Sequence, residues 1–306
     1  MIQELRHLPA PAKLNLFLHV TGRRADGYHL LETVFQLVDL EDRIDLRRRD
    51  DGVIELLNPI AGVPAEQDLT VRAARRLAQA SGCRQGVSIR LHKQIPMGGG
   101  LGGGSSDAAT VLLGLNRLWG LSLDRRVLMQ IALELGADVP FFIFGRSAYA
   151  TGIGERLRSC PQPQRHFVVL APPVALATAS VFSAPELTRN TKPLTIAGLS
   201  RGDRAFSGRN DLEPIVFASQ SEVRQSLQML CEAAEAEGVS ASRARMTGSG
   251  SCVFVPVDDA SGSRRIRDLI LRRQGAGSGQ VWWVRSIERH PLCEWAFPAR
   301  RSVLSG

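Results

Sequence analysis

Residues 96–110 read "PMGGGLGGGSSDAAT", so six glycines split by one leucine run directly into two serines and an aspartate. Consecutive glycines expose backbone N–H groups and tolerate positive φ, so such a loop can fold closely around an anion. Apolar residues then recur at helical spacing, which predicts a helix from about Ser106 to Gly120. A helix N-terminus adds unpaired donors and the positive end of its dipole. The stretch therefore predicts a phosphate cradle where a loop enters a helix.

Several known phosphate loops do not fit this stretch. No GK[ST] follows the glycines, as a P-loop requires, and the chain lacks the HRD and DFG strings of protein kinases. Gly98, Gly100 and Gly103 satisfy the dinucleotide pattern GxGxxG, but that match is nearly automatic in so glycine-rich a run. A dinucleotide-binding fold also has an acidic residue at the end of a strand about 20 positions further on, whereas Asp124, at that distance, opens a helix. A nicotinamide or flavin oxidoreductase remains an alternative, which binding of ATP against NAD would separate.

The composition describes an ordinary folded chain with a basic surplus. It has 306 residues, 44% hydrophobic content and a formal net charge of +8, enough to bury a sizeable core and to form two domains. The charge favours acidic partners such as phosphates, nucleic acid or an anionic membrane surface. Because no aromatic residues interleave with the arginine bursts, we expect no nucleic-acid partner; a binder would show salt-dependent retention.

Cysteine usage and hydropathy indicate a cytoplasmic protein. The five cysteines are scattered, with no CxxC pair and no metal-ligand spacing to the six histidines, as expected of reduced thiols. The first residues lack an apolar signal core, and no stretch approaches the roughly 18 to 20 apolar residues of a membrane span. We expect no membrane partner, and the chain as a monomer or a homodimer.

The order of elements favours an α+β fold, because strands and helices mix without a strict βαβ rhythm. A stretch with four prolines at 158–173 places a boundary near 160 and predicts domains 1–160 and 161–306. In the first we expect strands at 12–20, 34–46, 53–57 and 86–95, helices at 67–82 and from 124 to Gly136, and a turn feeding an apolar strand at 137–145. In the second we expect strands at 166–171, 251–257 and 279–287, helices at 218–237 and 261–273, and a loop at 190–214.

Three segments resemble the signatures of the GHMP kinases, the superfamily of galactokinase, homoserine kinase and mevalonate kinase. They are the glycine run, "PAKLNLFLHVTGRRADGYH" at 11–29 and "RMTGSGSCVFV" at 245–255, in the family's order and spread over most of the chain. The pairing of PAKLNLFL with RADGYH, the doubled triple glycine and "LGADVPFF" at 135–142 resemble the members that phosphorylate the 2-hydroxyl of a diphosphocytidyl polyol in the non-mevalonate isoprenoid pathway. A homoserine or mevalonate kinase is the alternative within the superfamily.

This resemblance implies a two-domain α+β GHMP kinase fold, with an N-terminal ribosomal protein S5 domain 2-like part and a ferredoxin-like C-terminal part. ATP, with Mg²⁺, would bind the N-terminal domain, and the substrate would lie between the domains. Lys13 and Asp138 would be the catalytic pair. ATP-binding residues would be Pro96, Met97, Gly98, Gly99, Gly100, Leu101, Gly102, Gly103, Gly104, Ser105 and Ser106, with Lys93 and Asp68 near the adenine. Substrate-binding residues would be Asn15, Tyr28, His29, Phe182, Thr247 and Gly248.

The chemistry of phosphoryl transfer asks for such a pair. Alternation along 12–20 sets Lys13 and Asn15 on one face of a strand, and Asp138 lies between a helix stop and Pro140. An aspartate with a pKa near 4 cannot deprotonate an alcohol outright, so it would orient the hydroxyl and accept the proton late. Lys13 would neutralise charge on the hydroxyl oxygen or the phosphoryl group. Without the context of the motifs, Lys13 would more often be a solvated lysine of a strand, and Asp138 a turn-forming residue.

Other residues of these motifs have more than one interpretation. Ser105 or Ser106 could contact phosphate directly or through Mg²⁺, or cap the helix, and no other protein ligand for the metal is predicted. Asp107 is more typical of a residue that compensates the helix dipole. Asp68 stands where the relatives have asparagine, and a carboxylate cannot donate as an amide does, which questions its contact with adenine. Tyr28 and Phe182 would stack on the cytosine, although without the resemblance a core role would be preferred.

Overall fold

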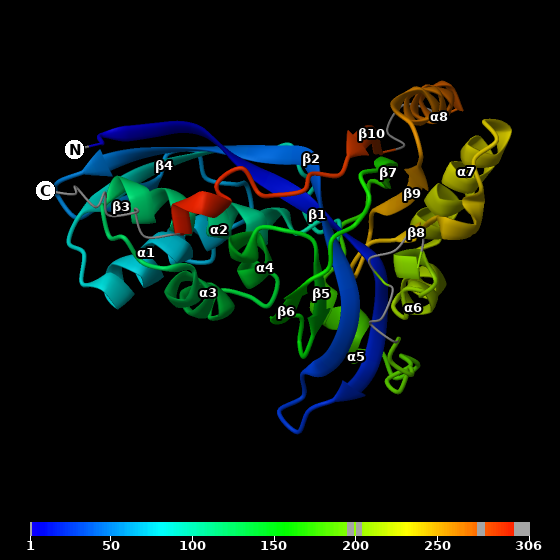
Figure 1. The fold of residues 1–306 in the computed structure, drawn as a ribbon, viewed down its shortest axis with the longest axis horizontal. Helices are drawn as coiled ribbons and strands as arrows, with labels where there is room; N and C mark the ends of the chain where they lie inside the picture. Colours follow the sequence, from blue (N-terminus) through cyan, green and yellow to red (C-terminus); the bar gives the residue numbers. More distant parts are fainter. Residues whose placement is uncertain (1, 195–198, 200–203, 274–278, 297–306) are drawn as a thin grey trace, which may run out of the picture.

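The computed structural model describes residues 2–194, 199, 204–273 and 279–296 (Figure 1). Two long antiparallel strands, β1 (Glu4–Arg23) and β2 (His29–Arg49), run along the first half of the molecule. The shorter strands β3 (Ile54–Leu56), β4 (Gly86–His92), β5 (Ala148–Thr151) and β6 (Arg156–Ser159) complete a sheet of order β3-β4-β2-β5-β6, with β1 paired to β2. In the central part of β1 the polar residues Lys13, Asn15 and His19 are buried along with the apolar ones, because both faces of the strand are covered there.

Four helices pack on one face of this sheet: α1 (Leu69–Ser81), α2 (Gly103–Leu118), α3 (Arg125–Leu133) and α4 (Val139–Phe144). The first hydrophobic core lies between them and the sheet, and α2 is buried along most of its length. Helix α2 begins at Gly103, three residues before the predicted start, and α3 ends at Leu133, before the predicted stop at Gly136.

The predicted strand after the turn at 137–145 is wrong, because these residues form helix α4. Asp138 precedes the helix, Pro140 lies in its first turn, and Gly145 ends it with a φ of +73°. Proline is well accommodated at such a position, where its missing N–H has no partner to lose. A run of six apolar residues has no periodicity that would distinguish a buried helix from a buried strand.

The second half contains a four-stranded sheet of order β10-β7-β9-β8. Its strands are β7 (His166–Ala171), β8 (Arg245–Met246), β9 (Val253–Val257) and β10 (Gln280–Arg285). The helices of this half are α5 (Thr178–Ser183), α6 (Glu213–Ser219), α7 (Ser221–Ala236) and α8 (Ala260–Arg273), with short 3₁₀ turns η1 (Arg204–Phe206) and η2 (Ala241–Arg243). The helix predicted at 218–237 is α7, which begins three residues later at Ser221, because Gln220 takes an extended conformation and separates it from the preceding α6.

The two halves share a core, in which Leu14 and Phe17 of β1 belong to one cluster with Phe167 and Phe254 of the second sheet. The chain then returns to the first half after β10, where the amide of Ile287 donates to the carbonyl of Leu37 at 3.0 Å. Helix η3 (Cys293–Ala296) packs beside α2. In the described parts of the chain, no helix combines the length and apolar character needed to cross a membrane. Part of the loop predicted at 190–214 lies outside the described residues.

Candidate active site

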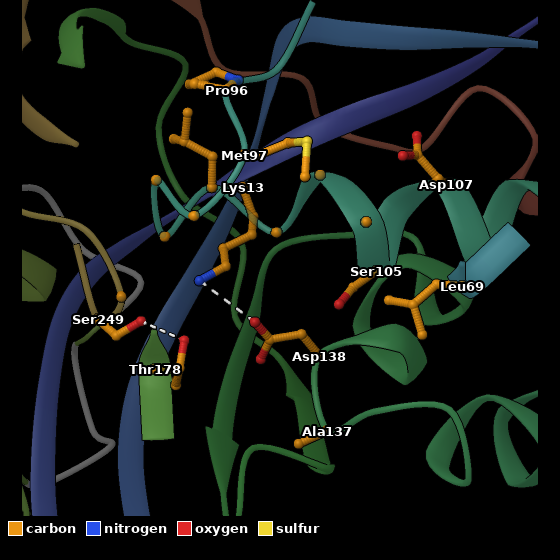
Figure 2. Close-up of a pocket in the computed structure, with 18 of the residues that line it drawn as sticks. Lys13, Leu69, Pro96, Met97, Ser105, Asp107, Ala137, Asp138, Thr178 and Ser249 are labelled. Atoms are coloured by element: carbon orange, nitrogen blue, oxygen red, sulfur yellow. Dashed lines mark hydrogen bonds and ion pairs between the residues drawn. The ribbon is translucent and has the colours of Figure 1, made fainter. Parts of the chain in front are cut away.

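A cavity of about 540 Å³ opens between the glycine run and the second half of the molecule (Figure 2). Its walls come from β1, β2, α1, β4, the glycine run, the start of α4, helix α5 and the loop after β8. Segments that are far apart in the sequence thus meet at one space. Most residues assigned to the site by resemblance line it: Lys13, Asn15, Asp68, Lys93, Pro96, Met97, Gly98, Gly99, Gly100, Leu101, Gly102, Gly103, Gly104, Ser105, Asp138, Phe182 and Gly248.

The carbonyl groups of the glycine run are bonded into the protein. Gly98 O accepts from Ser251 N at 3.2 Å, Gly99 O accepts from Cys252 N at 3.1 Å, and Leu101 O accepts from Lys13 N at 3.0 Å. In a trans peptide the N–H points opposite to the carbonyl, so the amides that follow these three carbonyls point to the other side. The first turn of α2, which begins at Gly103 within this run, adds unpaired N–H groups that favour an anion.

Glycine is required where this run meets the loop after β8. At Gly100, with a φ of +75°, an added Cβ would lie 2.1 Å from the carbonyl oxygen of Thr247. At Gly248, with a φ of +57°, it would lie 2.9 Å from the carbonyl oxygen of Gly100. Both positions have a left-handed backbone, which side chains rarely adopt. The first and second halves therefore touch here backbone to backbone.

Lys13 and Asp138 face one another across the cavity, as Figure 2 shows by the dashed line between them. The ammonium Nζ lies 3.6 Å from Asp138 Oδ2 and donates to Asn15 Oδ1 at 2.5 Å. The Lys13 side chain is 4% exposed and that of Asp138 is 36% exposed. The carboxylate caps no amide of α4, so its position serves no local role in that helix.

Burial lowers the pKa of the Lys13 ammonium below its ordinary value of 10.5, while Asp138 opposes that shift. At this distance two unit charges attract by about 5 kcal/mol at an effective dielectric constant near 20, and by less where water screens Asp138. The ring of Phe35, 5.3 Å from Nζ, also faces the charge. The site thus holds a buried cation next to a carboxylate that a ligand in the cavity can reach.

Asn15 connects β1 to the second half of the molecule. Its backbone amide donates to Thr247 Oγ1 at 2.9 Å, and its side-chain amide donates to Thr33 Oγ1 at 2.9 Å. Thr247 is fully buried and does not line the cavity, so its hydroxyl has a structural bond rather than an open position. Ser249, two residues on, does line the cavity and pairs with Thr178 of α5 at 2.8 Å (Figure 2).

The far end of the cavity has an apolar wall that the sequence did not indicate, formed by Ile60, Val63, Leu69 and Leu91. Lys93 lies here between two buried carboxylates, donating to Asp42 Oδ2 at 2.5 Å and to Asp107 Oδ2 at 2.8 Å. Burial, and the second carboxylate, raise the pKa of Asp107 to about 8 although Lys93 lowers it. Asp107 thus lies beyond the first turn of α2 and pairs with Lys93, which differs from the expected role of compensating the helix dipole.

Two further residues, Asp68 before α1 and Ser106 in α2, are already engaged in hydrogen bonds within the protein. Asp68 is the N-cap of α1, and its carboxylate accepts the amides of Thr70 and Val71. This capping role accounts for an aspartate at position 68 without a contact to adenine. The Ser106 hydroxyl is buried and donates to Pro11 O at 2.7 Å, so it is not available to a phosphate. Neither Ser105 nor Ser106 caps α2, because the N-cap is Gly102.

The aromatic residues assigned to the cytosine are placed differently from one another. Phe182 lines the cavity, whereas Tyr28 is 60% exposed at the tip of the β1–β2 hairpin and His29 is buried; neither is on the cavity wall. The His29 ring packs behind Phe182, with centroids 5.2 Å apart. Cys252 is fully buried, and burial raises the pKa of its thiol to about 12, which fits a packing role.

Family models match two parts of the chain, the GHMP kinases N terminal domain at residues 68–146 and the GHMP kinases C terminal at residues 196–276. The chain belongs to the GHMP kinase family, and it is accordingly a phosphotransferase. A homoserine kinase of Cytophaga hutchinsonii shares the fold, with a TM-score of 0.71 at 18% identity over 95% of this chain and 96% of that one.

Relatives that are similar to this chain over nearly their full length indicate a particular group within the family. A 4-diphosphocytidyl-2-C-methyl-D-erythritol kinase of Cupriavidus metallidurans is 50% identical over 96% of this chain and 97% of its own. Another of Nitrosospira multiformis is 52% identical over 94% and 93%. A crystal structure of 4-(cytidine 5'-diphospho)-2C-methyl-D-erythritol kinase matches with a TM-score of 0.76 and 34% identity over 92% of this chain and 98% of that one. Within the GHMP kinases, the chain thus falls with this group.

Proposed function

We propose that this protein transfers the γ-phosphoryl group of ATP to the 2-hydroxyl of 4-diphosphocytidyl-2-C-methyl-D-erythritol, giving the 2-phosphate and ADP in the non-mevalonate isoprenoid pathway. The observation that supports this most directly is the approach of Lys13 Nζ and Asp138 Oδ2 to 3.6 Å in a cavity beside the glycine run. The identity to kinases of that name over nearly the whole chain supports the same substrate.

In this proposal the glycine run and the start of α2 hold the triphosphate, and the apolar wall at Ile60 and Leu91 takes the adenine. Phosphoryl transfer has a loose transition state, so alignment and charge stabilisation supply most of the catalysis. Asp138 orients the acceptor hydroxyl and accepts its proton as the new O–P bond forms. Lys13 stabilises the negative charge on the transferring group.

Magnesium fits this site as a companion of ATP. Ser105 lines the cavity at the first turn of α2, and its hydroxyl would be the protein oxygen nearest the phosphates. Asp107 also lines the cavity, but it is 2% exposed and its Oδ2 already accepts from Lys93, so the Ser105 hydroxyl is the more accessible oxygen. Among the described residues no cluster of three acidic, histidine or cysteine side chains could bind a metal by itself. When bound, Mg²⁺ neutralises charge on the phosphates.

The test is Asp138→Asn, assayed by mass spectrometry of the product formed from ATP, Mg²⁺ and the diphosphocytidyl substrate. We expect kcat to fall about 100- to 10,000-fold with the fold retained, because the amide cannot accept the proton. Asp50→Asn, an exposed aspartate with an 81% exposed side chain, is the matched control and keeps the wild-type rate. A rate for Asp138→Asn within about threefold of wild type would remove Asp138 from this role. Phosphorylation of homoserine or mevalonate instead would assign another GHMP kinase activity.

A further inference from the structure

An arginine that the motifs do not include, Arg189, lies behind the aromatic wall of the cavity. A guanidinium has five N–H donors, and the structure gives an acceptor for each. The acceptors are His29 Nε2 for Nε at 3.1 Å, Pro185 O and Leu187 O for Nη1 at 3.2 and 3.0 Å, and Phe182 O and Ala184 O for Nη2 at 3.5 and 2.6 Å. Each donor thus has an acceptor within the protein.

These acceptors come from two different elements. Four are carbonyls of the last turn of α5 and the loop after it, and the fifth is the ring of His29 at the start of β2. Arg189 therefore ties the β1–β2 hairpin to α5, the two elements that bound the substrate end of the cavity. Such a saturated guanidinium is rigid, because its planar fork fixes the directions of all five bonds.

The bond to His29 also sets the state of that ring. Because Arg189 Nε donates, His29 Nε2 must be the unprotonated nitrogen, and the proton lies on Nδ1. Burial lowers the pKa of His29, and the positive charges of Arg189 and Arg23, the charged groups that act on it, lower it further. The neutral ring then packs on Phe182 at 5.2 Å with an interplanar angle of 30°.

We propose that Arg189 is a positioning residue for the substrate base: it holds the Phe182 ring against the pyrimidine of the diphosphocytidyl group, through the Phe182 carbonyl and through His29 kept as the neutral Nδ1–H tautomer. This role rests on the kinase activity proposed above. Phe182 is the aromatic residue on the cavity wall at this end, and it is held from behind at both its backbone and its ring.

The kinetic test compares Arg189→Ala with the control Arg224→Ala, an exposed arginine on α7. In Arg189→Ala the stacking of Phe182 on the base should be weakened but not abolished. We therefore expect the KM for the diphosphocytidyl substrate to rise about 5- to 30-fold, which is about 1–2 kcal/mol. We expect kcat and the KM for ATP to stay within about twofold. Added guanidinium ion should restore the low KM of Arg189→Ala, and Arg189→Lys should be intermediate. Equal rises in both KM values, or no rise at all, overturn the role.

A second measurement needs no substrate. Nitrogen-15 NMR of the imidazoles should show His29 as the Nδ1–H tautomer titrating below 6.5, and its pKa should rise in Arg189→Ala. An unchanged titration would overturn the link through His29. If the wild type does not phosphorylate the diphosphocytidyl substrate, the proposed function fails while the NMR result still decides whether Arg189 controls His29.

Discussion

Gly100→Ala tests whether the phosphate loop depends on contact between the two halves of the molecule. The added Cβ would lie 2.1 Å from Thr247 O and 3.0 Å from Gly250 O, both backbone atoms of the loop after β8. Neither can move aside as a flexible side chain would. The φ of +75° adds the strain of a left-handed conformation.

The magnitude follows from these two effects. A left-handed alanine costs about 1–2 kcal/mol, and forced overpacking about 1–3 kcal/mol more, so we expect a loss of about 2–5 kcal/mol in the free energy of unfolding. Gly120→Ala is the matched control, since its φ is +66° but nothing lies within 4 Å of the new Cβ. It should lose only the first part, about 1–2 kcal/mol.

The assays are urea unfolding and the KM for ATP. Because separating the two loops also moves the amides that face the cavity, Gly100→Ala should raise the KM for ATP by about tenfold, which is 1.4 kcal/mol of binding. Gly120→Ala should leave that KM unchanged. Equal destabilisation of the two variants together with a wild-type KM in Gly100→Ala would refute the reasoning.

Two predictions concern pH. Burial lowers the pKa of His290 to about 3, so the native state keeps this ring neutral while the unfolded chain protonates it below pH 6.5. The free energy of unfolding should therefore fall by up to about 1.4 kcal/mol per pH unit as pH decreases below 6.5. In urea unfolding, His290→Asn should flatten the dependence of this free energy on pH between pH 5 and 6.5, and a dependence parallel to that of the wild type would contradict the prediction. Burial raises the pKa of Asp107 to about 8 from 3.8, so the native state loses stability as pH rises towards 8. The free energy of unfolding of Asp107→Asn should therefore increase relative to that of the wild type from pH 5 to 8. A difference between the two free energies that does not change with pH would count against the shift.

Local patterns predict the parts of the site that a single element forms. The alternation of β1 indicated that Lys13 and Asn15 project together, and the structure places both on the cavity wall. The glycine run predicted a loop entering a helix, and α2 follows it. Both features depend on residues next to each other in the chain, whose backbone preferences act without the rest of the fold.

Contacts between distant residues could not be predicted in this way. Asp42 reaches Lys93 across 51 positions, and nothing in the sequence around it distinguishes it from a solvated aspartate of a strand. Ser106 lies in the first turn of α2, but the tertiary neighbour Pro11 determines that its hydroxyl is buried. Tyr28, although it belongs to a motif, is exposed at a hairpin tip, where the sequence cannot show what it faces.

The arrangement of β1 explains how the cavity responds to changes at its two ends. The amide of Lys13 donates to Leu101 O, and that of Asn15 donates to Thr247 Oγ1, so one strand holds the phosphate loop and the loop after β8 on either side of the lysine. The substrate end is tied separately, through Arg189 and through the bond of Thr178 to Ser249. Changes in the loops should therefore alter the KM for ATP, and changes around α5 the KM for the acceptor substrate.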